Sequence, residues 1–169
     1  CAVRNDIDVP PLKLAPTHRW ISAGEATSDV QVLTADEKED TAPTGMDLKW
    51  WHKTKPGDSY ARVIAREESR VSCFNTIRLS GDLPACTLPS VMDQIQHWGE
   101  RRKLTYREWK RLGSFPDDYH AKTDKIGKYM IGMSVPPKMT EQVARAVCEQ
   151  WLNVNYSELS NDNQAKNPH

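Results

Sequence analysis

Apolar residues recur at helical spacing in the second half of the chain. Thr105 and Glu108 have the spacing of a capping box, so a helix is predicted to begin at this point. Trp109 and Leu112 share one face of that helix. Gly113 follows directly, and because glycine favours the ends of helices, we expect the helix to stop there.

A second helix is predicted directly after Pro136 and Pro137, since proline suits the first turn, where amides lack partners within the helix. Apolar side chains then follow along one helical face. They are Met139, Val143, Ala146, Val147 and Trp151. From Asn153 onward the chain is polar, and we expect the helix to fray.

Shorter elements are predicted in the first half of the chain. Residues 1–20 have the pattern of a strand end followed by a proline-rich connection, because proline prevents regular helix. A short helix is expected at residues 22–28, capped by Ser22 with Glu25 three residues on. The charged residues between 35 and 47 predict a loop.

The middle of the chain mixes aromatic and basic residues. Residues 48–70 are divided by a Pro-Gly-Asp turn, which favours small strands and loops over long helices. Residues 74–88 predict two extended pieces around Ser80-Gly81-Asp82. With the later helices, these pieces predict an α+β fold.

Composition limits the partners of the chain. Its 169 residues carry 23 basic and 23 acidic side chains, so no overall field attracts nucleic acid, and any DNA affinity must come from local patches. Neither a membrane-spanning stretch nor a signal peptide is visible, and we expect a cytoplasmic protein that does not bind membranes. The chain does not begin with methionine, so a fragment or a trimmed chain is expected.

The four cysteines are scattered without a C-x-x-C pair, which argues against metal binding and against a disulfide framework. We interpret all four, Cys1, Cys73, Cys86 and Cys148, as reduced thiols. For Cys86 and Cys148, which lie among apolar neighbours, packing is the favoured role.

Two segments offer candidate contacts with DNA phosphates. Lys49, Lys53 and Lys55 are the candidates in the first. The nearby aromatic residues Trp50, Trp51 and Tyr60 suit stacking on bases, but core packing is favoured for at least one tryptophan. His52 is ambiguous.

The second segment, residues 100–111, has a local excess of positive charge that includes Arg102. Its alternative interpretation is a solvated helix face with i,i+4 ion pairs, which is favoured for Lys110 and Arg111. Arg78 stands alone in an extended segment, where a structural role and a phosphate contact are equally plausible.

Four segments, in this order, resemble one protein family, the DNA cytosine-5 methyltransferases. They are Val3-Arg4-Asn5-Asp6, residues 78–88, residues 97–119 with Phe115-Pro116-Asp117-Asp118, and residues 131–137 with Ser134-Val135-Pro136-Pro137. Each alone is weak, but the ordered set with family-like spacing is specific, and the second and fourth resemble the ninth and tenth motifs of the family.

The resemblance implies the organisation of the chain. Residues 1–29 would form the end of a catalytic-domain strand and a linker, and residues 30–88 a small strand-and-loop target-recognition region with the ninth motif. Residues 89–169 would return to the catalytic domain with the tenth motif. That domain is an α/β, Rossmann-like fold dependent on S-adenosyl-L-methionine, and double-stranded DNA is the substrate.

The resemblance also assigns roles to residues. Arg78, Thr87 and Arg102 join Lys49, Lys53 and Lys55 as expected DNA contacts. Ser134 and Val135 are expected at the methionine end of the cofactor. Met133 departs from the family, which usually has asparagine at this position, and a hydrogen-bonding side chain is thereby lost.

The catalytic features of the family are absent from this sequence. It holds no Pro-Cys pair for the nucleophile, no Glu-Asn-Val segment and no glycine-rich cofactor turn. No catalytic residue is therefore predicted here, and methyl transfer would need an N-terminal catalytic half on the same or a separate chain. The alternatives are a specificity subunit of a split methyltransferase, a non-enzymatic DNA-binding remnant and an RNA-binding relative.

Overall fold

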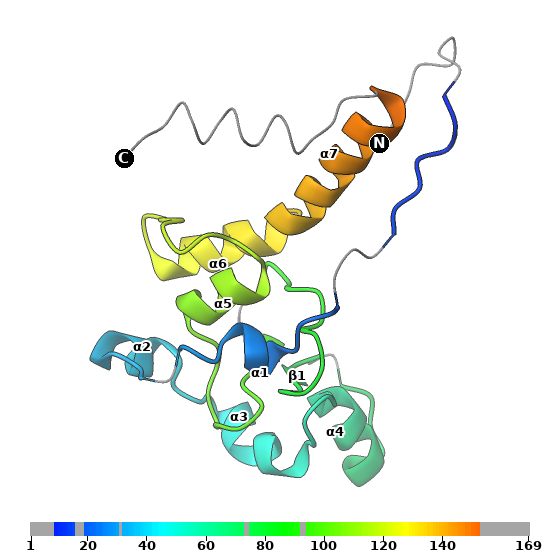
Figure 1. Ribbon diagram of the computed structural model, residues 1–169. Helices are drawn as coiled ribbons and strands as arrows, with labels where there is room; N and C mark the ends of the chain where they lie inside the picture. Colours follow the sequence, from blue (N-terminus) through cyan, green and yellow to red (C-terminus); the bar gives the residue numbers. More distant parts are fainter. Residues whose placement is uncertain (1–8, 16–18, 31, 73–74, 92–93, 153–169) are drawn as a thin grey trace. The chain divides into compact units, whose positions relative to one another are not determined.

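The computed structural model describes residues 9–15, 19–30, 32–72, 75–91 and 94–152 (Figure 1). The elements, in chain order, are α1 (Ala23–Ala26), α2 (Ala35–Asp40), α3 (Gly45–Trp50), the 3-10 helix η1 (Trp51–Lys53), α4 (Tyr60–Glu68), β1 (Ile77–Arg78), β2 (Ile95–Gln96), α5 (Tyr106–Leu112), α6 (Asp124–Met133) and α7 (Pro137–Trp151). This mixture of helices with a small sheet agrees with the predicted α+β class.

The chain divides into two compact units. The larger one is Trp20–Pro136, and the smaller one pairs the described residues before Trp20 with those from Pro137 onward. The boundaries predicted near residues 30 and 88 concern function, and they remain a prediction.

The sheet of the larger unit separates two kinds of side chain. β1 and β2 are parallel, with Ile77 opposite Ile95 and Arg78 opposite Gln96. Because successive side chains of a strand point to opposite faces, the isoleucines and Arg78 face different ways. Ile77 and Ile95 pack in one apolar cluster, whereas Arg78 lies against the ring of Trp51.

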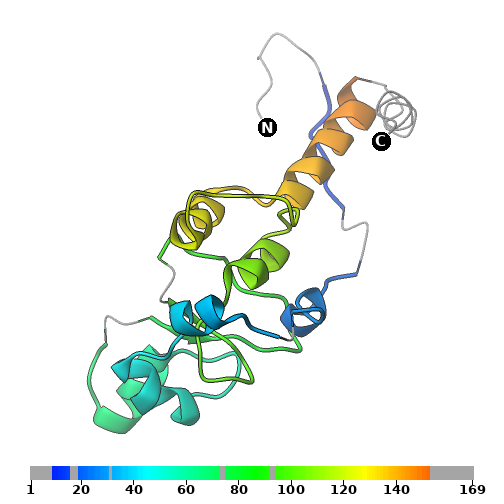
Figure 2. The same cartoon turned by 90° about the vertical axis from the view of Figure 1, so that its left-hand side faces the viewer.

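Two apolar clusters form the interior of the larger unit. The first joins residues from α1, the sheet, α5 and α6: Ala23, Leu79, Ile95, Leu104, Tyr106, Trp109 and Ile131. In keeping with this cluster, α5 packs against both α1 and α6 (Figure 2). The second joins residues from α3, η1 and α4: Trp50, Trp51, Tyr60, Val63 and Ile64. Both tryptophans are buried, which confirms the predicted core role.

Three predicted helices are confirmed, and each has the expected cap or start. The Ser22 side chain accepts from the Glu25 amide at the start of α1. Thr105 and Glu108 form a complete capping box on α5, and Gly113 is its C-cap. The last helix, α7, begins at Pro137 as predicted. Its predicted fraying beyond Asn153 lies outside the described residues.

The predictions for residues 35–47 and 48–70 were wrong. The first stretch forms α2 and the start of α3 in place of a loop, because Thr34 and Glu37 make a capping box. The second forms helices in place of strands. Ser59 caps α4, and the buried side chains of that helix, Tyr60, Val63 and Ile64, recur at helical spacing.

Two further differences concern single elements. The first extended piece predicted in 74–88 is confirmed as β1, but residues 86–88 form no strand, and β1 pairs with β2. The helix α6 was not predicted. Thr123 caps it through a bond from the Ile126 amide to its hydroxyl.

The cysteine predictions are partly tested. Cys86 is half-buried and packs against the first cluster, and burial raises the pKa of its thiol. Cys148 is half-buried, while Cys1 and Cys73 lie outside the described residues.

The smaller unit consists of α7 and an extended segment that runs beside it. The Gln150 side chain accepts from the Lys13 amide at 2.9 Å and donates to the Lys13 carbonyl at 2.7 Å. The Trp151 indole donates to the Pro10 carbonyl at 2.9 Å. Within this unit, Met139 of the predicted apolar stripe is exposed, Val143, Val147 and Trp151 are half-buried, and Ala146 is buried.

Candidate DNA-binding and cofactor-contacting residues

Arg78 joins three segments of the larger unit through its guanidinium group. Its Nε and Nη2 donate to the Trp98 carbonyl at 2.9 and 2.5 Å. Its Nη1 donates to the carbonyls of Thr54 at 2.8 Å and Trp51 at 3.2 Å. The same group lies 3.5 Å from the centroid of the Trp51 ring. This geometry supports the structural role for Arg78, which fixes the turn after η1.

The turn that Arg78 fixes carries exposed basic side chains. Lys53 and Lys55 are exposed on either side of buried Thr54. His52, also exposed, contacts the Trp51 ring edge-on, and Arg101 Nη1 lies 3.4 Å from its Nε2. A rigid backbone therefore presents these groups to solvent from one short segment.

The lysines Lys49 and Lys53 are exposed but ion-paired. Lys49 Nζ lies 2.8 Å from a carboxylate oxygen of Glu68, and Lys53 Nζ lies 2.6 Å from one of Glu67. The pairs with Lys49 and Arg70 hold the pKa of the Glu68 carboxyl below its usual range. These partners lie at the end of α4.

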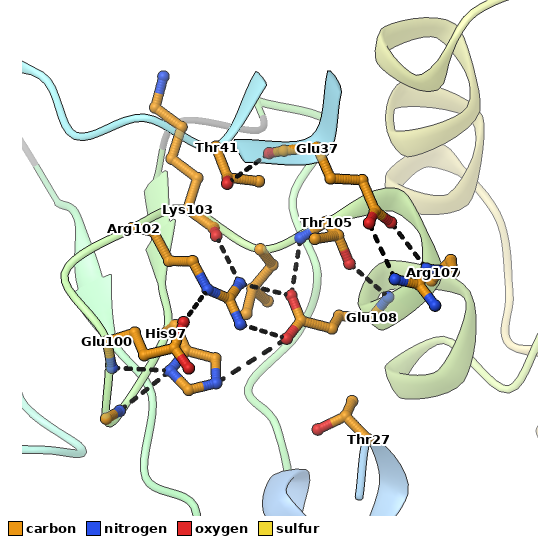
Figure 3. Close-up of polar contacts among 12 residues, drawn as sticks. Thr27, Glu37, Thr41, His97, Glu100, Arg102, Lys103, Thr105, Arg107 and Glu108 are labelled. Atoms are coloured by element: carbon orange, nitrogen blue, oxygen red, sulfur yellow. Dashed lines mark hydrogen bonds and ion pairs between the residues drawn. The ribbon is translucent and has the colours of Figure 1, made fainter. Parts of the chain in front are cut away.

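Arg102, in contrast, is buried in a polar network (Figure 3). Its guanidinium makes two bonds of 2.8 Å to the two oxygens of Glu108, and its Nε contacts Glu100 at 2.7 Å. Glu108 also accepts from the Thr105 amide at 2.7 Å. Because its donors are used inside the fold, Arg102 holds the start of α5 in this structure, and no phosphate contact by Arg102 is proposed.

Lys110 was expected on a solvated helix face, and that expectation was wrong. Its side chain is buried, and its ammonium group donates to the Asp117 carbonyl. Arg111 is partly exposed and pairs with Asp29 at 2.5 Å and Asp117 at 3.0 Å. Neither ion pair has the i,i+4 spacing that was expected.

His97 completes the network around Arg102 and is held in one tautomer. Its Nδ1 accepts from the amides of Gly99 at 3.1 Å and Glu100 at 2.9 Å. The proton of the neutral ring therefore sits on Nε2, which lies 3.8 Å from Glu108. Burial first, and then the charge of Arg102, lowers the pKa of His97 to about 4.

Thr87 and the two expected cofactor contacts lie in connections between elements. Thr87 is exposed in the irregular segment that precedes β2. Ser134 caps the end of α6, where its hydroxyl donates to the Met130 carbonyl at 2.7 Å. Val135 and Met133 are exposed by 61% and 66%, so neither is packed in the interior of the larger unit.

Gly132 explains why the segment that contains Thr87 can pack against α6. A Cβ atom at Gly132 would lie 2.3 Å from the carbonyl oxygen of Pro89, a distance that no side chain tolerates. Glycine is therefore required where the backbone of α6 meets the backbone of residues 89–90. This contact places residues 89–90, directly after the segment that resembles the ninth motif, against Gly132 in the segment that resembles the tenth.

A comparison with known protein families decides the identity of the chain. The profile of the C-5 cytosine-specific DNA methylases matches residues 20–149. The chain belongs to this family. The type II methyltransferase M.BbvI of Brevibacillus brevis is 29% identical over 171 residues, a match that covers 94% of this chain and 45% of that protein.

Two other methylases of type II systems are similar over different extents. M1.HphI of Haemophilus parahaemolyticus is 35% identical over 78 residues, 46% of this chain and 21% of the relative. M.AquIB of a Picosynechococcus strain is 28% identical over 138 residues, 75% of this chain and 96% of the relative. The chain thus spans less than half the length of M.BbvI and M1.HphI. No solved structure matches it significantly.

Most of these residues could be predicted from the sequence, but the side chains that they contact could not. Glu67 and Glu68 were not singled out, because they lie 14 and 19 residues from the lysines they contact. Glu108 was recognised as half of a capping box, but its pairing with Arg102 was not. The i,i+6 spacing of that pair gives no signal in a helix pattern.

No group of three or more histidine, cysteine or acidic side chains within the described ranges is arranged to hold a metal ion. Among the described helices, none is long and apolar enough to cross a membrane.

Proposed function

We propose that this chain is the part of a DNA cytosine-5 methyltransferase that recognises DNA and contributes to the cofactor pocket. Methyl transfer from S-adenosyl-L-methionine to C5 of cytosine would then need a catalytic half that supplies the cysteine nucleophile. The observation that carries the proposal is the family match over residues 20–149 in a sequence without a Pro-Cys pair. Type II methyltransferases among the relatives support a role in restriction-modification.

The recognition role is proposed for residues 30–88. The exposed basic side chains of Lys49, Lys53 and Lys55 lie on helices and turns built on a tryptophan-rich cluster. Phosphate contacts of this kind fix the register of a protein on duplex DNA. Arg78 serves this surface indirectly as a positioning residue, since it holds the backbone of the turn at Thr54. Thr87 is proposed as a further DNA contact.

The cofactor role is proposed for the connection between α6 and α7. Ser134 and Val135 are exposed there and lie within the tenth-motif resemblance. We expect them to line the methionine end of S-adenosyl-L-methionine once the Rossmann-like domain is complete. The side chain of Met133 offers this cofactor only an apolar contact, where the family usually has an amide.

A second form of the proposal is that the catalytic half is a separate chain. It is favoured by the match to M.AquIB, which covers 96% of that methyltransferase. The matched part of this chain has no Pro-Cys pair, no Glu-Asn-Val segment and no glycine-rich turn. Co-expression with the half of a relative such as M.BbvI that lies outside the match tests whether two separate chains suffice, because only a complete pair would transfer methyl groups.

The test of the proposal measures DNA binding and methyl transfer by the same preparation. The purified chain is expected to bind duplex DNA weakly, with a log–log salt slope of about −3 if three phosphates are neutralised. With tritium-labelled cofactor, incorporation into DNA should not exceed a blank without protein. Binding that is independent of salt, or incorporation by the chain alone, would contradict the proposal.

A further inference from the structure

Five charged residues at the junction of α3, η1 and α4 form what we name the α4 ion-pair cluster. Its members are Lys49, Lys53, Glu67, Glu68 and Arg70. Lys49 pairs with one oxygen of Glu68 at 2.8 Å, and Arg70 Nε pairs with the other at 2.6 Å. Lys53 pairs with Glu67 at 2.6 Å.

The cluster is built on a buried aromatic ring. Lys49 Nζ and Lys53 Nζ lie 4.6 and 5.2 Å from the centroid of the Trp50 ring, and Trp50 is only 1% exposed. Ser69 ends α4 in the left-handed conformation, with φ 50°, after which Arg70 pairs with Glu68. Both ammonium groups therefore lie over the same buried ring.

The same ammonium groups remain accessible to a ligand in solvent. The side chains of Lys49 and Lys53 are 55% and 49% exposed, and those of their glutamate partners 30% and 35%. Ion pairs this exposed are weak in water. A DNA phosphate belongs to a dense row of negative charges that lysines neutralise, so it can compete with a single carboxylate for each of these lysines.

We propose that Glu67 and Glu68 compete with DNA for Lys49 and Lys53. Phosphates bind these lysines only when they displace the two carboxylates. The cluster carries three positive and two negative charges, so its attraction for phosphate is reduced but not abolished. The consequence is weaker binding to DNA of any sequence, which leaves a larger share of discrimination to contacts with bases.

This inference rests on the proposed function, because it requires that residues 30–88 bind DNA. The test compares the unmodified chain with E67Q/E68Q, with K49Q/K53Q and with the quadruple variant that combines all four changes. Binding of a short fluorescein-labelled duplex is followed by anisotropy at several salt concentrations. E39Q/E141Q is the matched control, since it changes net charge equally and removes the exposed Glu141–Arg145 pair elsewhere.

The expected result is a gain of affinity that depends on the lysines. E67Q/E68Q should bind DNA about three- to tenfold more tightly at low salt, as two exposed ion pairs allow. E39Q/E141Q should change affinity by less than about twofold. In the quadruple variant the gain should vanish, so that its affinity equals that of K49Q/K53Q.

Each other outcome contradicts either the proposed competition or the proposed DNA-binding function. Loss of affinity in K49Q/K53Q without a gain in E67Q/E68Q would reject the competition and keep the DNA-binding function. A gain that persists in the quadruple variant would show a general charge effect and reject the inference. No measurable DNA binding by any variant would instead reject the proposed function.

Discussion

His97 illustrates how a single buried ring can be restricted to one protonation state. Its Nδ1 accepts hydrogen bonds from two backbone amides. A proton on Nδ1 would therefore point at two N–H groups that can only donate. Burial and the charge of Arg102 act in the same direction and lower its pKa to about 4. In the unfolded chain the ring titrates near its ordinary value, roughly 6.5. The folded state therefore binds fewer protons between these two values.

The first prediction follows from this difference. As pH falls from about 6.5 to 4, the unfolded chain gains a proton that the folded chain resists, and the free energy of unfolding should drop by on the order of 3 kcal/mol. His97→Asn keeps an acceptor for the amides of Gly99 and Glu100 but does not titrate. Its unfolding by urea at pH 7, 5.5 and 4.5 should show a clearly weaker pH dependence.

The carboxylates provide the internal control for that experiment. Glu37 and Glu100 have lowered pKa values, first because arginine side chains donate hydrogen bonds to them, so their contribution is lost only at lower pH. The parent chain and His97→Asn should therefore both lose stability below about pH 4.5. Parallel curves for the parent and His97→Asn above that pH would rule out His97 as the group responsible.

A second prediction compares Arg78 with Lys110. Arg78→Ala leaves the carbonyls of Trp98 and Thr54 without their donor, and Lys110→Ala does the same to the carbonyl of Asp117. Each loss should cost about 1–3 kcal/mol of unfolding free energy. Only Arg78→Ala should also weaken DNA binding, because only that residue holds the turn before Lys55. Equal loss of DNA affinity in the two variants would argue against the positioning role.

Between elements, a helix and a loop of the larger unit approach each other closely at a glycine. Gly132 of α6 has no room for a Cβ against Pro89, whereas Gly45, at the start of α3, has nothing within 4 Å of that position. The same substitution should therefore have opposite effects at the two sites. Gly132→Ala should destabilise the chain by about 1–3 kcal/mol through overpacking.

Gly45→Ala is the matched control. It should be neutral or stabilising by up to about 1 kcal/mol, because alanine favours helix over glycine. Thermal unfolding of both variants, with circular dichroism at a helical wavelength, checks the pair. A melting temperature of Gly132→Ala equal to that of the parent would show that the loop at Pro89 moves aside without cost.

The elements that could be predicted from sequence are those with a local signal. The helices at Ser22, Thr105 and Pro137 combine a cap or proline start with apolar periodicity, and all three are present. Thr34 and Glu37 carry the same capping signal, but the charged residues after them led to the prediction of a loop. At α4, the basic and aromatic composition obscured the helical spacing of its buried side chains.

For the candidate site, the sequence predicted which residues take part but not which side chains they contact. Composition identified Lys49 and Lys53, but not the carboxylates of Glu67 and Glu68 that contact them. Arg102 has the same charge as the lysines, yet its burial against Glu108 depends on the packing of α5. Contacts of this kind arise from tertiary structure, and residue spacing alone does not encode them.

At the scale of the whole molecule, the partly exposed apolar stripe of α7 predicts dependence on a partner. Exposed apolar patches commonly mark interaction surfaces, and Met139 and Leu14 are each more than half exposed. We expect the isolated chain to self-associate, and to gain stability when a catalytic half is supplied. Trp151→Ala should weaken that gain by about 1.5–3 kcal/mol.

Hydrogen exchange of the α7 amides, with and without the catalytic half, measures this effect. Protection should rise on addition of that half, and Trp151→Phe, which loses the bond to Pro10 but keeps an aromatic ring, should retain most of the rise. Full protection of α7 in a monomeric chain without a partner would refute the prediction.

The pairing of Gln150 with Lys13 has a consequence for how this sequence can evolve. These two residues are 137 positions apart, and their bonds close a loop that contains the whole of the larger unit. The entropic cost of closing a flexible loop rises by only about 0.6 kcal/mol for each doubling of its length. Insertions or deletions of tens of residues between the two anchoring segments would thus alter the closure cost very little. The larger unit can therefore change in length while the pairing of Lys13 with Gln150 stays the same.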